Sequence, residues 1–213
     1  MRLTIFGATG GTGVRLVRRA LDGGDEVTAV VRDPARLPGG LREAAGVVQA
    51  DVVDPAAIEE AVKGSDAVIT AIGTREGRAP TTVCADSTRA IVAAMRAAGS
   101  RRLVAVSASG LDAGPGDDPL TRFVVKPLIL QRILKHAFAD MRAAEEVVRG
   151  SGLDWTIVRP PRLTEGAGAG RYRKAVDRHI LGGFSLARED LAAALLDLAD
   201  DASAIGHTVA VAR

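Results

Sequence analysis

The 213-residue sequence predicts one α/β domain built on a doubly wound parallel sheet, with helices on both faces. Short apolar runs rich in Val, Ile and Leu alternate along the chain with alanine-rich amphipathic stretches. Strands separated by helices pair in parallel through right-handed crossovers, so this alternation favours a doubly wound sheet. Hydrophobic residues make up 47% of the chain and charged residues 25%, which is typical of a globular protein rather than a disordered one.

Seven short apolar runs predict the strands of this sheet. They are residues 3–6, 27–31, 46–50, 67–72, 103–106, 156–158 and 208–211. The first run is apolar without alternation, which indicates a strand that is buried on both faces.

Four stretches with apolar residues at helical spacing predict helices. They are residues 14–21, 56–62, 82–98 and 191–198. Asp33-Pro34 and Asp54-Pro55 each predict the start of a helix or helical turn, because Asp accepts from free N–H groups and Pro suits the first helical position. Gly99 is expected to end the longest helix.

A glycine-rich motif, G-x-x-G-x-x-G, stands directly between the first predicted strand and the first predicted helix. Its first glycine permits a tight turn, the second lets the backbone approach a pyrophosphate, and the third lets the helix pack close to the strand. Phosphates would then lie on the free N–H groups at the helix N-terminus. The motif predicts a dinucleotide-binding, Rossmann-like domain over residues 1–213. The expected cofactor contacts are Gly7, Thr9, Gly10, Gly11, Thr12 and Gly13.

The end of the second predicted strand selects between the two nicotinamide dinucleotides. A carboxylate at this point binds the 2′-hydroxyl of NAD, whereas an arginine accommodates the 2′-phosphate of NADP. The position holds Arg32, and Arg36 follows it, while Asp33 is more simply the cap of the next turn. The sequence therefore predicts NADP as the cofactor, with NAD less favoured.

Two further strand ends are candidate cofactor contacts. Asp51 and Val52 follow the third predicted strand, where a carboxylate could accept from the adenine amino group or, equally, bond to nearby backbone N–H groups. Small residues end the fourth predicted strand, and they suit the place where a dinucleotide crosses the crevice of the sheet. These residues are Ala71, Ile72, Gly73 and Thr74.

Several segments resemble the atypical short-chain dehydrogenase/reductases with an NAD(P)H-binding fold, and within that group the flavin reductase (biliverdin reductase B) type. They are residues 4–13 (TIFGATGGTG), 27–38 (VTAVVRDPARLP), 67–75 (AVITAIGTR), 80–95 (PTTVCADSTRAIVAAM), 150–153 (GSGL) and 159–161 (RPP). The resemblance implies that NADPH binds through the glycine loop and the two arginines, with its nicotinamide near the fifth and sixth strand ends. The residues concerned are Gly10, Thr12, Gly13, Arg32 and Arg36, then residues 107–109 and Pro160.

The resemblance also implies hydride transfer from nicotinamide to a flat conjugated acceptor such as a flavin, a quinone or a bilin. Ser107-Ala108-Ser109 departs from the flavin reductase pattern, in which a Thr-Ser pair ends the fifth strand, so a bilin substrate is implied less firmly than the cofactor. Ser107 and Ser109 are the candidate catalytic residues, because either hydroxyl could donate to an acceptor oxygen or could merely satisfy loop backbone. Loops near residues 110–135 and 160–185 are expected to form the acceptor pocket. The first comprises a loop and then a helical stretch.

The Tyr-x-x-x-Lys pair with which most short-chain dehydrogenases reduce ketones has no counterpart at the only tyrosine, Tyr172, because position 176 is Val. Flavins and quinones take hydride with protons supplied later by water, so they suit a site without a positioned acid. An NADPH-dependent oxidoreductase of this type is the leading prediction. The alternative is a non-catalytic NADP-binding regulator that senses redox state and acts through a protein partner. An epimerase or dehydratase is disfavoured, because those enzymes also use the tyrosine.

Composition argues against several other classes of partner. A net charge of +2 and an aromatic content of 3% disfavour nucleic-acid binding, and no apolar run reaches the length of a membrane span. No histidines stand at metal-ligand spacing, so no metal is expected. The single cysteine, Cys84, is expected to be a small buried side chain, and together with an N-terminus unlike a signal peptide it predicts a cytoplasmic protein. A monomer or small homo-oligomer acting on a small molecule is expected.

Overall fold

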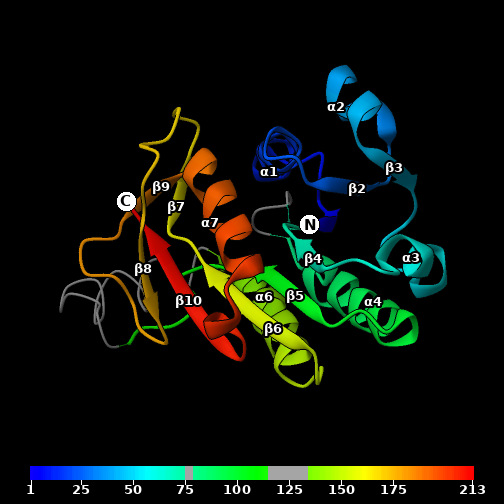
Figure 1. The fold of residues 1–213 in the computed structure, drawn as a ribbon. Helices are drawn as coiled ribbons and strands as arrows, with labels where there is room; N and C mark the ends of the chain where they lie inside the picture. The colour runs from blue at the N-terminus through cyan, green and yellow to red at the C-terminus, as the bar shows by residue number, and fades with distance from the viewer. Residues whose placement is uncertain (75–78, 115–133) are drawn as a thin grey trace.

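The computed structural model describes residues 1–74, 79–114 and 134–213. Among them, eight strands form one sheet (Figure 1). Their bounds are β1 Arg2–Phe6, β2 Glu26–Val31, β3 Gly46–Gln49, β4 Ala67–Thr70, β5 Arg102–Val106, β6 Asp154–Arg159, β8 Arg173–Val176 and β10 His207–Ala212. The order is β3-β2-β1-β4-β5-β6-β10-β8, and every pair is parallel except β10 with β8. The predicted doubly wound α/β fold is confirmed.

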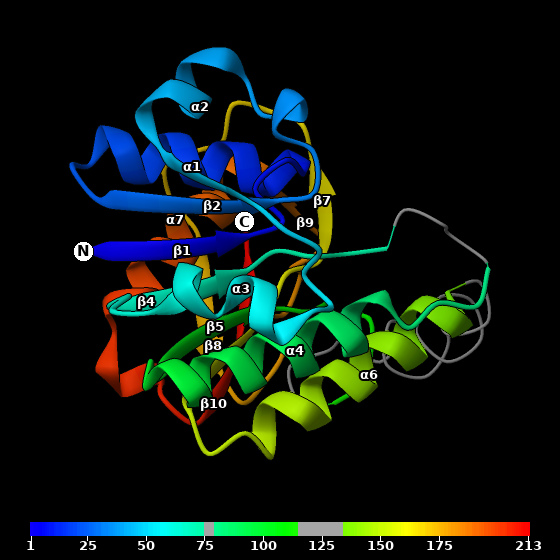
Figure 2. The same ribbon diagram turned by 90° about the vertical axis from the view of Figure 1, so that its right-hand side faces the viewer.

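Helices cover both faces of this sheet (Figure 2). The main ones are α1 Gly11–Asp22, α3 Pro55–Val62, α4 Val83–Ala98, α6 Lys135–Arg149 and α7 Arg188–Asp200. α1 and α7 pack together on one face, whereas α3, α4 and α6 pack on the other, and each face has its own aliphatic core. β1 contributes to both cores, because Leu3 and Ile5 face one and Phe6 faces the other. The first strand is therefore buried on both faces, as its apolar run predicts.

The local signals for helix ends are confirmed. The Asp33 carboxylate accepts from the Ala35 N–H at 3.0 Å where a 3-10 turn begins, and the Asp54 carboxylate accepts from the Ala56 N–H at 3.0 Å at the start of α3. Gly99 ends α4 with a φ of +74°. α1 and α7 both begin earlier than predicted, at residues 11 and 188, because the glycine loop and the polar sequence before residue 191 already form their first turns.

Several elements of the fold, including α6, are absent from the strands and helices predicted above. α2 (Gly39–Ala44) is a short helix that opens on two glycines. β7 (Arg162–Thr164) and β9 (Ser185–Ala187) pair in parallel as a separate small sheet, and β8 extends the main sheet. The expectation that residues 160–185 are loops is therefore wrong for the parts that form these strands. The loop and helix expected over residues 110–134 lie largely outside the described residues.

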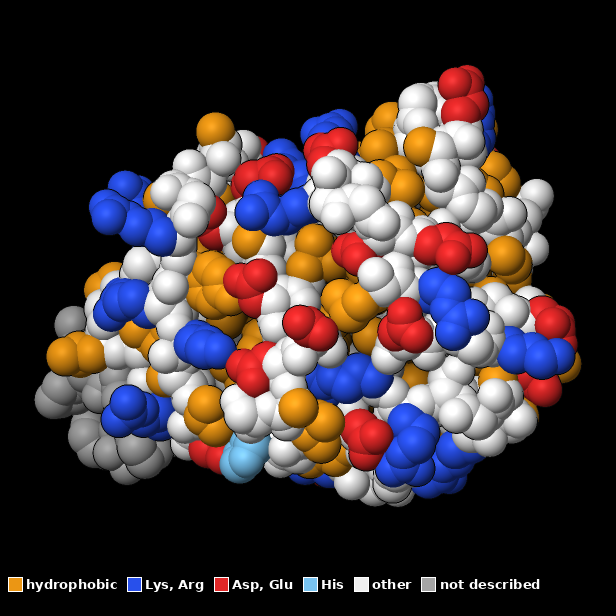
Figure 3. Space-filling model, viewed as in Figure 1, with side chains coloured by type: hydrophobic (Ala, Val, Ile, Leu, Met, Phe, Trp, Pro, Cys, Tyr) orange, Lys and Arg blue, Asp and Glu red, His pale blue; other side chains and the backbone are white. Residues whose placement is uncertain are grey.

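The surface is charged but mixed in sign. On the face of α7 and β8 that Figure 3 shows, basic and acidic side chains are interspersed. Lys174 of the edge strand β8 pairs with Asp201 at 2.9 Å, and Arg173 donates to the backbone carbonyl of Arg213 at 2.9 Å. Charged side chains on an edge strand oppose pairing with a further strand. In the part of the chain that the structure describes, no helix is both long and apolar enough to cross a lipid bilayer.

Candidate cofactor and acceptor site

The candidate site lies at the edge of the sheet where the parallel strands end. The strand order reverses between β1 and β4, and ligands of open α/β sheets bind in the crevice at such a reversal. The chain segments that follow β1 and β4 lie close together there, and the Ala71 N–H donates to the carbonyl of Phe6 at 3.0 Å. A Cβ added to Gly7 would lie 2.8 Å from the backbone carbonyl of Ala71. The crevice is thus lined closely by backbone.

The glycine loop has the two steric features that the motif predicts. Gly7 has a φ of +78°, which favours glycine, and its carbonyl accepts from the Gly10 N–H at 2.9 Å to close a tight turn. A Cβ on Gly13 would lie 2.1 Å from the carbonyl oxygen of Gly7. α1 therefore packs against the end of β1 more closely than any side chain would allow.

The N-terminus of α1 presents unpaired donors to this crevice. Gly10 is the N-cap and supplies no side chain. Within the described residues, the N–H groups of Gly11, Thr12 and Gly13 have no acceptor, whereas the next N–H, that of Val14, donates to the Gly10 carbonyl at 2.9 Å. Free N–H groups at the positive end of a helix bind phosphate, so the loop fits the pyrophosphate of a dinucleotide. Thr9 lies half-buried in the turn that precedes these donors.

Two arginines stand free beyond the end of β2. The side chains of Arg32 and Arg36 are exposed, and neither makes an ion pair or side-chain hydrogen bond with another described residue. Asp33 between them is engaged as the cap of the 3-10 turn. Both guanidinium groups are therefore available to a phosphate at the strand end, where the adenosine 2′ position of a dinucleotide lies in Rossmann-like folds.

The other predicted contacts lie on the same edge but differ in their surroundings. One carboxylate oxygen of Asp51 accepts from the Val53 N–H at 3.3 Å, which is the second of the two roles expected for it. Val52 is half-buried against the core that α3 and α4 share. Ala71, Ile72 and Thr74 are half-buried and Gly73 is exposed, and all four follow the end of β4.

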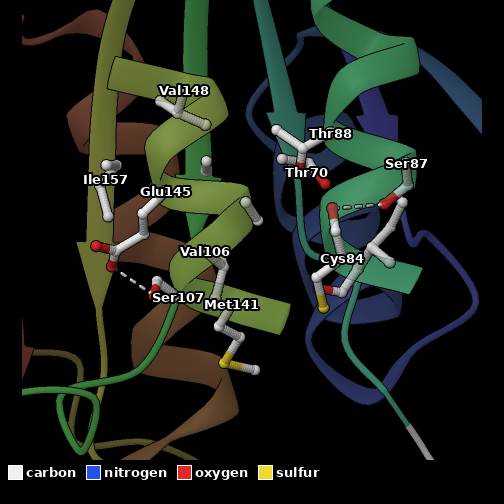
Figure 4. A pocket seen from close by; sticks show the side chains of 13 residues that line it. Thr70, Cys84, Ser87, Thr88, Val106, Ser107, Met141, Glu145, Val148 and Ile157 are labelled. Atoms are coloured by element: carbon white, nitrogen blue, oxygen red, sulfur yellow. Dashed lines mark hydrogen bonds between the residues drawn. The ribbon is translucent and has the colours of Figure 1, made fainter. Parts of the chain in front are cut away.

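A buried carboxylate fixes the hydroxyl of Ser107. The Ser107 Oγ donates to the Glu145 Oε1 at 2.7 Å, as Figure 4 shows. Arg159 donates two hydrogen bonds to the same carboxylate, at 2.8 and 2.6 Å, and Arg149 donates a third at 2.7 Å. Burial alone would raise the pKa of Glu145, but the hydrogen bonds from Arg159 and Ser107 outweigh it and hold the pKa below its ordinary value. An ionised Glu145 only accepts, so the Ser107 proton is directed toward it.

Ser109 is the freer of the two serines. The backbones of residues 107–109 and 158–160 run side by side, with the Ser107 N–H donating to the Val158 carbonyl at 2.8 Å and the Ser109 N–H to the Pro160 carbonyl at 2.9 Å. The Ser109 hydroxyl is half-buried and makes no hydrogen bond to another described residue. It can therefore donate to a ligand, whereas the Ser107 hydroxyl is already committed.

A small hollow lies between α4 and α6 beside Ser107 (Figure 4). Its lining includes the hydroxyls of Thr70, Ser87 and Thr88. At ≈ 20 Å³ its interior has room for about one water molecule and is far too small for a flavin ring. Cys84 also lines it, and burial raises the pKa of this thiol to about 12, so it is an unreactive side chain. An acceptor therefore has to lie outside this hollow.

Several residues of the site carry no sequence signal. Glu145 and Arg159 come from α6 and the end of β6, and nothing in their local sequence indicates that they pair beneath Ser107. Arg188 and Glu165 meet beside the glycine loop from opposite ends of the β7–β9 segment. Only their proximity in the fold reveals such contacts.

Replacing Glu145 by Gln is expected to destabilise the protein by about 2–3 kcal/mol at neutral pH, because Arg159 loses a buried partner but keeps Asp112 at 2.9 Å. The Glu145 pKa is depressed in the folded state, so its stabilisation is complete above its ordinary value of 4.5 and fades as the pH falls through the folded value. The free energies of unfolding of wild type and Glu145→Gln, measured in urea from pH 7 to pH 3, should become similar at acid pH. Glu146→Gln, on the exposed neighbour, is the matched control and should have little effect at any pH. A difference in free energy of unfolding between wild type and Glu145→Gln that stays constant with pH would contradict an ionised Glu145 paired with Arg159.

Comparison with known proteins agrees with this geometry. The sequence matches the family described as NAD(P)H-binding over residues 7–202. The uncharacterized protein YwnB of Bacillus subtilis is 27% identical over 202 residues, which cover 92% of this chain and 91% of that protein. A (4-alkanoyl-5-oxo-2,5-dihydrofuran-3-yl)methyl phosphate reductase of Streptomyces griseus is 33% identical over 161 residues, or 74% of this chain and 46% of that protein.

A similar solved structure extends the comparison to the fold. The anaerobilin reductase ChuY of Escherichia coli O157:H7 superimposes with a TM-score of 0.80 at 22% identity, covering 100% of this chain and 97% of that one. The family match spans almost the whole chain and includes the glycine loop and the ends of all the parallel strands except β1 and β10. The chain therefore belongs to the NAD(P)H-binding family, in agreement with its resemblance to the atypical short-chain dehydrogenase/reductases.

Proposed function

We propose that the protein is an NADPH-dependent reductase that transfers a hydride to a flat conjugated acceptor such as a flavin, a quinone or a bilin-like molecule. One observation carries the proposal: the sheet edge holds a glycine cradle with N–H donors and two arginines that are unpaired among the described residues, and the end of β5 on that edge offers hydroxyls but no tyrosine. The cradle and arginines support the cofactor, and the missing tyrosine restricts the acceptor.

The residues of the sheet edge have separate roles in holding the cofactor. The N–H groups of Gly11, Thr12 and Gly13 would bind the pyrophosphate, while Arg32 and Arg36 would bind the 2′-phosphate that distinguishes NADP from NAD. The strand ends at residues 71–74 and at Pro160 would flank the rest of the dinucleotide. When bound, the reduced dinucleotide supplies the hydride.

The tyrosine of the chain is unavailable as an acid. The Tyr172 hydroxyl donates to the Asp197 carboxylate of α7 at 2.7 Å, and burial together with this carboxylate raises its pKa. A Tyr-x-x-x-Lys pair built on Tyr172 would need a lysine at position 176, which is Val. A positioned acid contributes about 10²–10⁴-fold to such a reaction, so acceptors that take hydride without one are favoured.

The remaining catalytic contribution comes from placement. Ser109 can donate to an acceptor oxygen, and the Glu145–Ser107 bond keeps the neighbouring hydroxyl out of that role. Holding donor and acceptor face to face lowers a barrier by several kcal/mol without any acid. The Streptomyces griseus relative and the E. coli structure both bear the name of a reductase, which supports the same class of reaction.

Replacing Arg32 by Glu is expected to weaken NADPH binding by at least about 30-fold and NADH binding by less than about threefold, because only the 2′-phosphate meets the new charge. Isothermal titration with both cofactors measures the two losses. Arg42→Glu, at an exposed arginine in α2, is the matched control for net charge and should leave both affinities near those of wild type. Equal losses for NADPH and NADH in Arg32→Glu would contradict the 2′-phosphate role.

The reductase proposal is tested by NADPH oxidation in the presence of FMN, a benzoquinone or biliverdin. We expect turnover with at least one acceptor and a higher kcat/KM with NADPH than with NADH. Measurable NADPH binding without turnover of any acceptor would overturn the proposal and favour the redox-sensing regulator. The regulator should also bind NADP and NADPH with clearly different affinities.

A further inference from the structure

We infer that Arg188 is an additional phosphate ligand of the cofactor site, positioned by Glu165 over the first turn of α1. The inference rests on the proposed placement of the dinucleotide and adds a residue that the glycine motif does not contain. Arg188 is the first residue of α7 and lies 176 positions along the chain from Thr12.

The Arg188 side chain lies directly against the glycine loop. Its Nη1 donates to the Thr12 Oγ1 at 3.4 Å, and its Nε donates to the Glu165 Oε1 at 2.6 Å. A Cβ on Gly11 would lie 3.0 Å from the Cδ of Arg188 and 3.1 Å from its Nε. Gly11 therefore leaves room for this side chain, and the guanidinium reaches the turn whose N–H groups are free.

Electrostatics indicates that an anion belongs at this position. The N-terminus of a helix carries a partial positive charge and disfavours a cation, and Arg188 stands at the N-termini of two helices, α1 and α7. Glu165 is an anion close to it, but the Glu165 side chain is 69% exposed and is shared with Arg15 at 3.1 Å. A dinucleotide phosphate on the α1 N–H groups would supply the missing negative charge next to the guanidinium.

The cluster as a whole carries surplus positive charge. Arg188 and Arg15 share Glu165, while Arg15 and Arg19 share Glu189, at 3.7 and 3.9 Å. Three guanidinium groups thus share two carboxylates among these five side chains. Since Glu189 and Asp190 in the first turn of α7 offset the positive end of that helix, it is the positive end of α1 beside Arg188 and Arg15 that favours a bound phosphate.

Hydrogen bonds tie the segment beneath Arg188 to α7. The next buried carboxylate on α7, Asp190, accepts from the N–H groups of Ala169 and Gly170 at 2.9–3.0 Å. These bonds hold the segment that carries Glu165 against α7, and α7 packs on α1 (Figure 1). Glu165 bonds to the Nε of Arg188, which leaves the terminal nitrogen Nη1 at the Thr12 hydroxyl of the glycine loop. Glu165 is thus a positioning residue, and Arg188 is the ligand.

The position of Arg188 also predicts which phosphate it binds. It contacts Thr12 and Gly11 at the start of α1, whereas the free Arg32 and Arg36 lie beyond β2. Arg188 should therefore act on the pyrophosphate, which NADPH and NADH share. Its loss should weaken both cofactors to the same extent, in contrast to the loss of Arg32.

The test is isothermal titration of NADPH and NADH into wild type, Arg188→Ala, Arg188→Lys and Glu165→Gln, with folding checked by thermal denaturation. We expect Arg188→Ala to weaken both cofactors about tenfold and Arg188→Lys to recover part of the loss, since a charged hydrogen bond is removed and then partly restored. Glu165→Gln should bind both cofactors as tightly as wild type or up to about threefold more tightly, because the amide oxygen still accepts from Nε while a negative charge near the phosphate is removed.

The possible outcomes separate the inference from the proposed function. Failure of wild type to bind either cofactor would overturn the proposed function itself. Binding by wild type with unchanged affinity in a folded Arg188→Ala would overturn only the role of Arg188. Loss of affinity in Glu165→Gln as large as in Arg188→Ala would also overturn it, because a merely structural ion pair is broken equally from either side. If Arg188→Ala does not fold, Arg188→Lys and Glu165→Gln still test whether Arg188 binds phosphate. An Arg188→Lys variant with the same affinity for both cofactors as wild type would contradict the guanidinium contact.

Discussion

Gly13→Ala should lose more than about 3 kcal/mol of folding free energy, because its Cβ would lie 2.1 Å from the carbonyl oxygen of Gly7. The neighbouring atoms are backbone on both sides, so no side-chain rotation relieves the overlap. α1 would have to move away from β1 and disrupt the core of Leu16 and Val17 beneath it. Urea unfolding followed by circular dichroism measures the loss.

A glycine without close neighbours provides the control for this experiment. Gly40, in α2, would place a Cβ in open space. Gly40→Ala is expected to be neutral or slightly stabilising, because alanine restricts the unfolded chain more than glycine does. If Gly13→Ala proved as stable as Gly40→Ala, the close packing of α1 on β1 would be contradicted.

Gly10→Val, three residues earlier, should leave the fold intact and lower the affinity for NADPH and NADH more than about 100-fold, the equivalent of losing the pyrophosphate contacts. Gly10 has φ −80° and ψ 165°, which valine adopts readily, and its Cβ would meet only the Gly7 carbonyl oxygen, at 3.2 Å. The valine side chain would instead fill the space in front of the free N–H groups. Titration calorimetry, with thermal denaturation alongside, measures affinity and stability separately.

Gly10→Ala gives an intermediate control, because one methyl group obstructs the phosphate less than an isopropyl group. We expect its affinity to lie between those of wild type and Gly10→Val. A Gly10→Val variant that binds NADPH as wild type does would contradict the assignment of the loop. Gly13 is thus required by the packing of α1 on β1, whereas Gly10 is required by the bound pyrophosphate.

Much of the fold follows from local sequence. The Asp33 and Asp54 caps and the αL glycine at residue 99 act over two or three residues, so they are readable without a structure. The glycine loop is local in part, because Gly7 has a positive φ and a Cβ on Gly13 would meet Gly7 only six residues away, whereas the close approach of Gly7 to Ala71 depends on the packing of β1 beside β4.

Contacts between distant segments could not be read in this way. β8 has the sequence RKAV, whose charged first half does not alternate as a strand does, and only its pairing with β10 makes it one. The two glycines that open α2 likewise favour a loop. In the site, the pairing of Glu145 with Arg159 and of Arg188 with the loop depends on tertiary packing, so the sequence indicated the cofactor cradle but not the charges around it.

Single turnover under anaerobic conditions tests the central claim most directly. The protein is mixed with NADPH and an excess of FMN or a benzoquinone, and the absorbance of the reduced nicotinamide is followed together with that of the acceptor. We expect each NADPH consumed to yield one reduced acceptor, at a rate far above that without protein and slower with NADH. NADPH that binds but is not consumed with either acceptor would contradict the account.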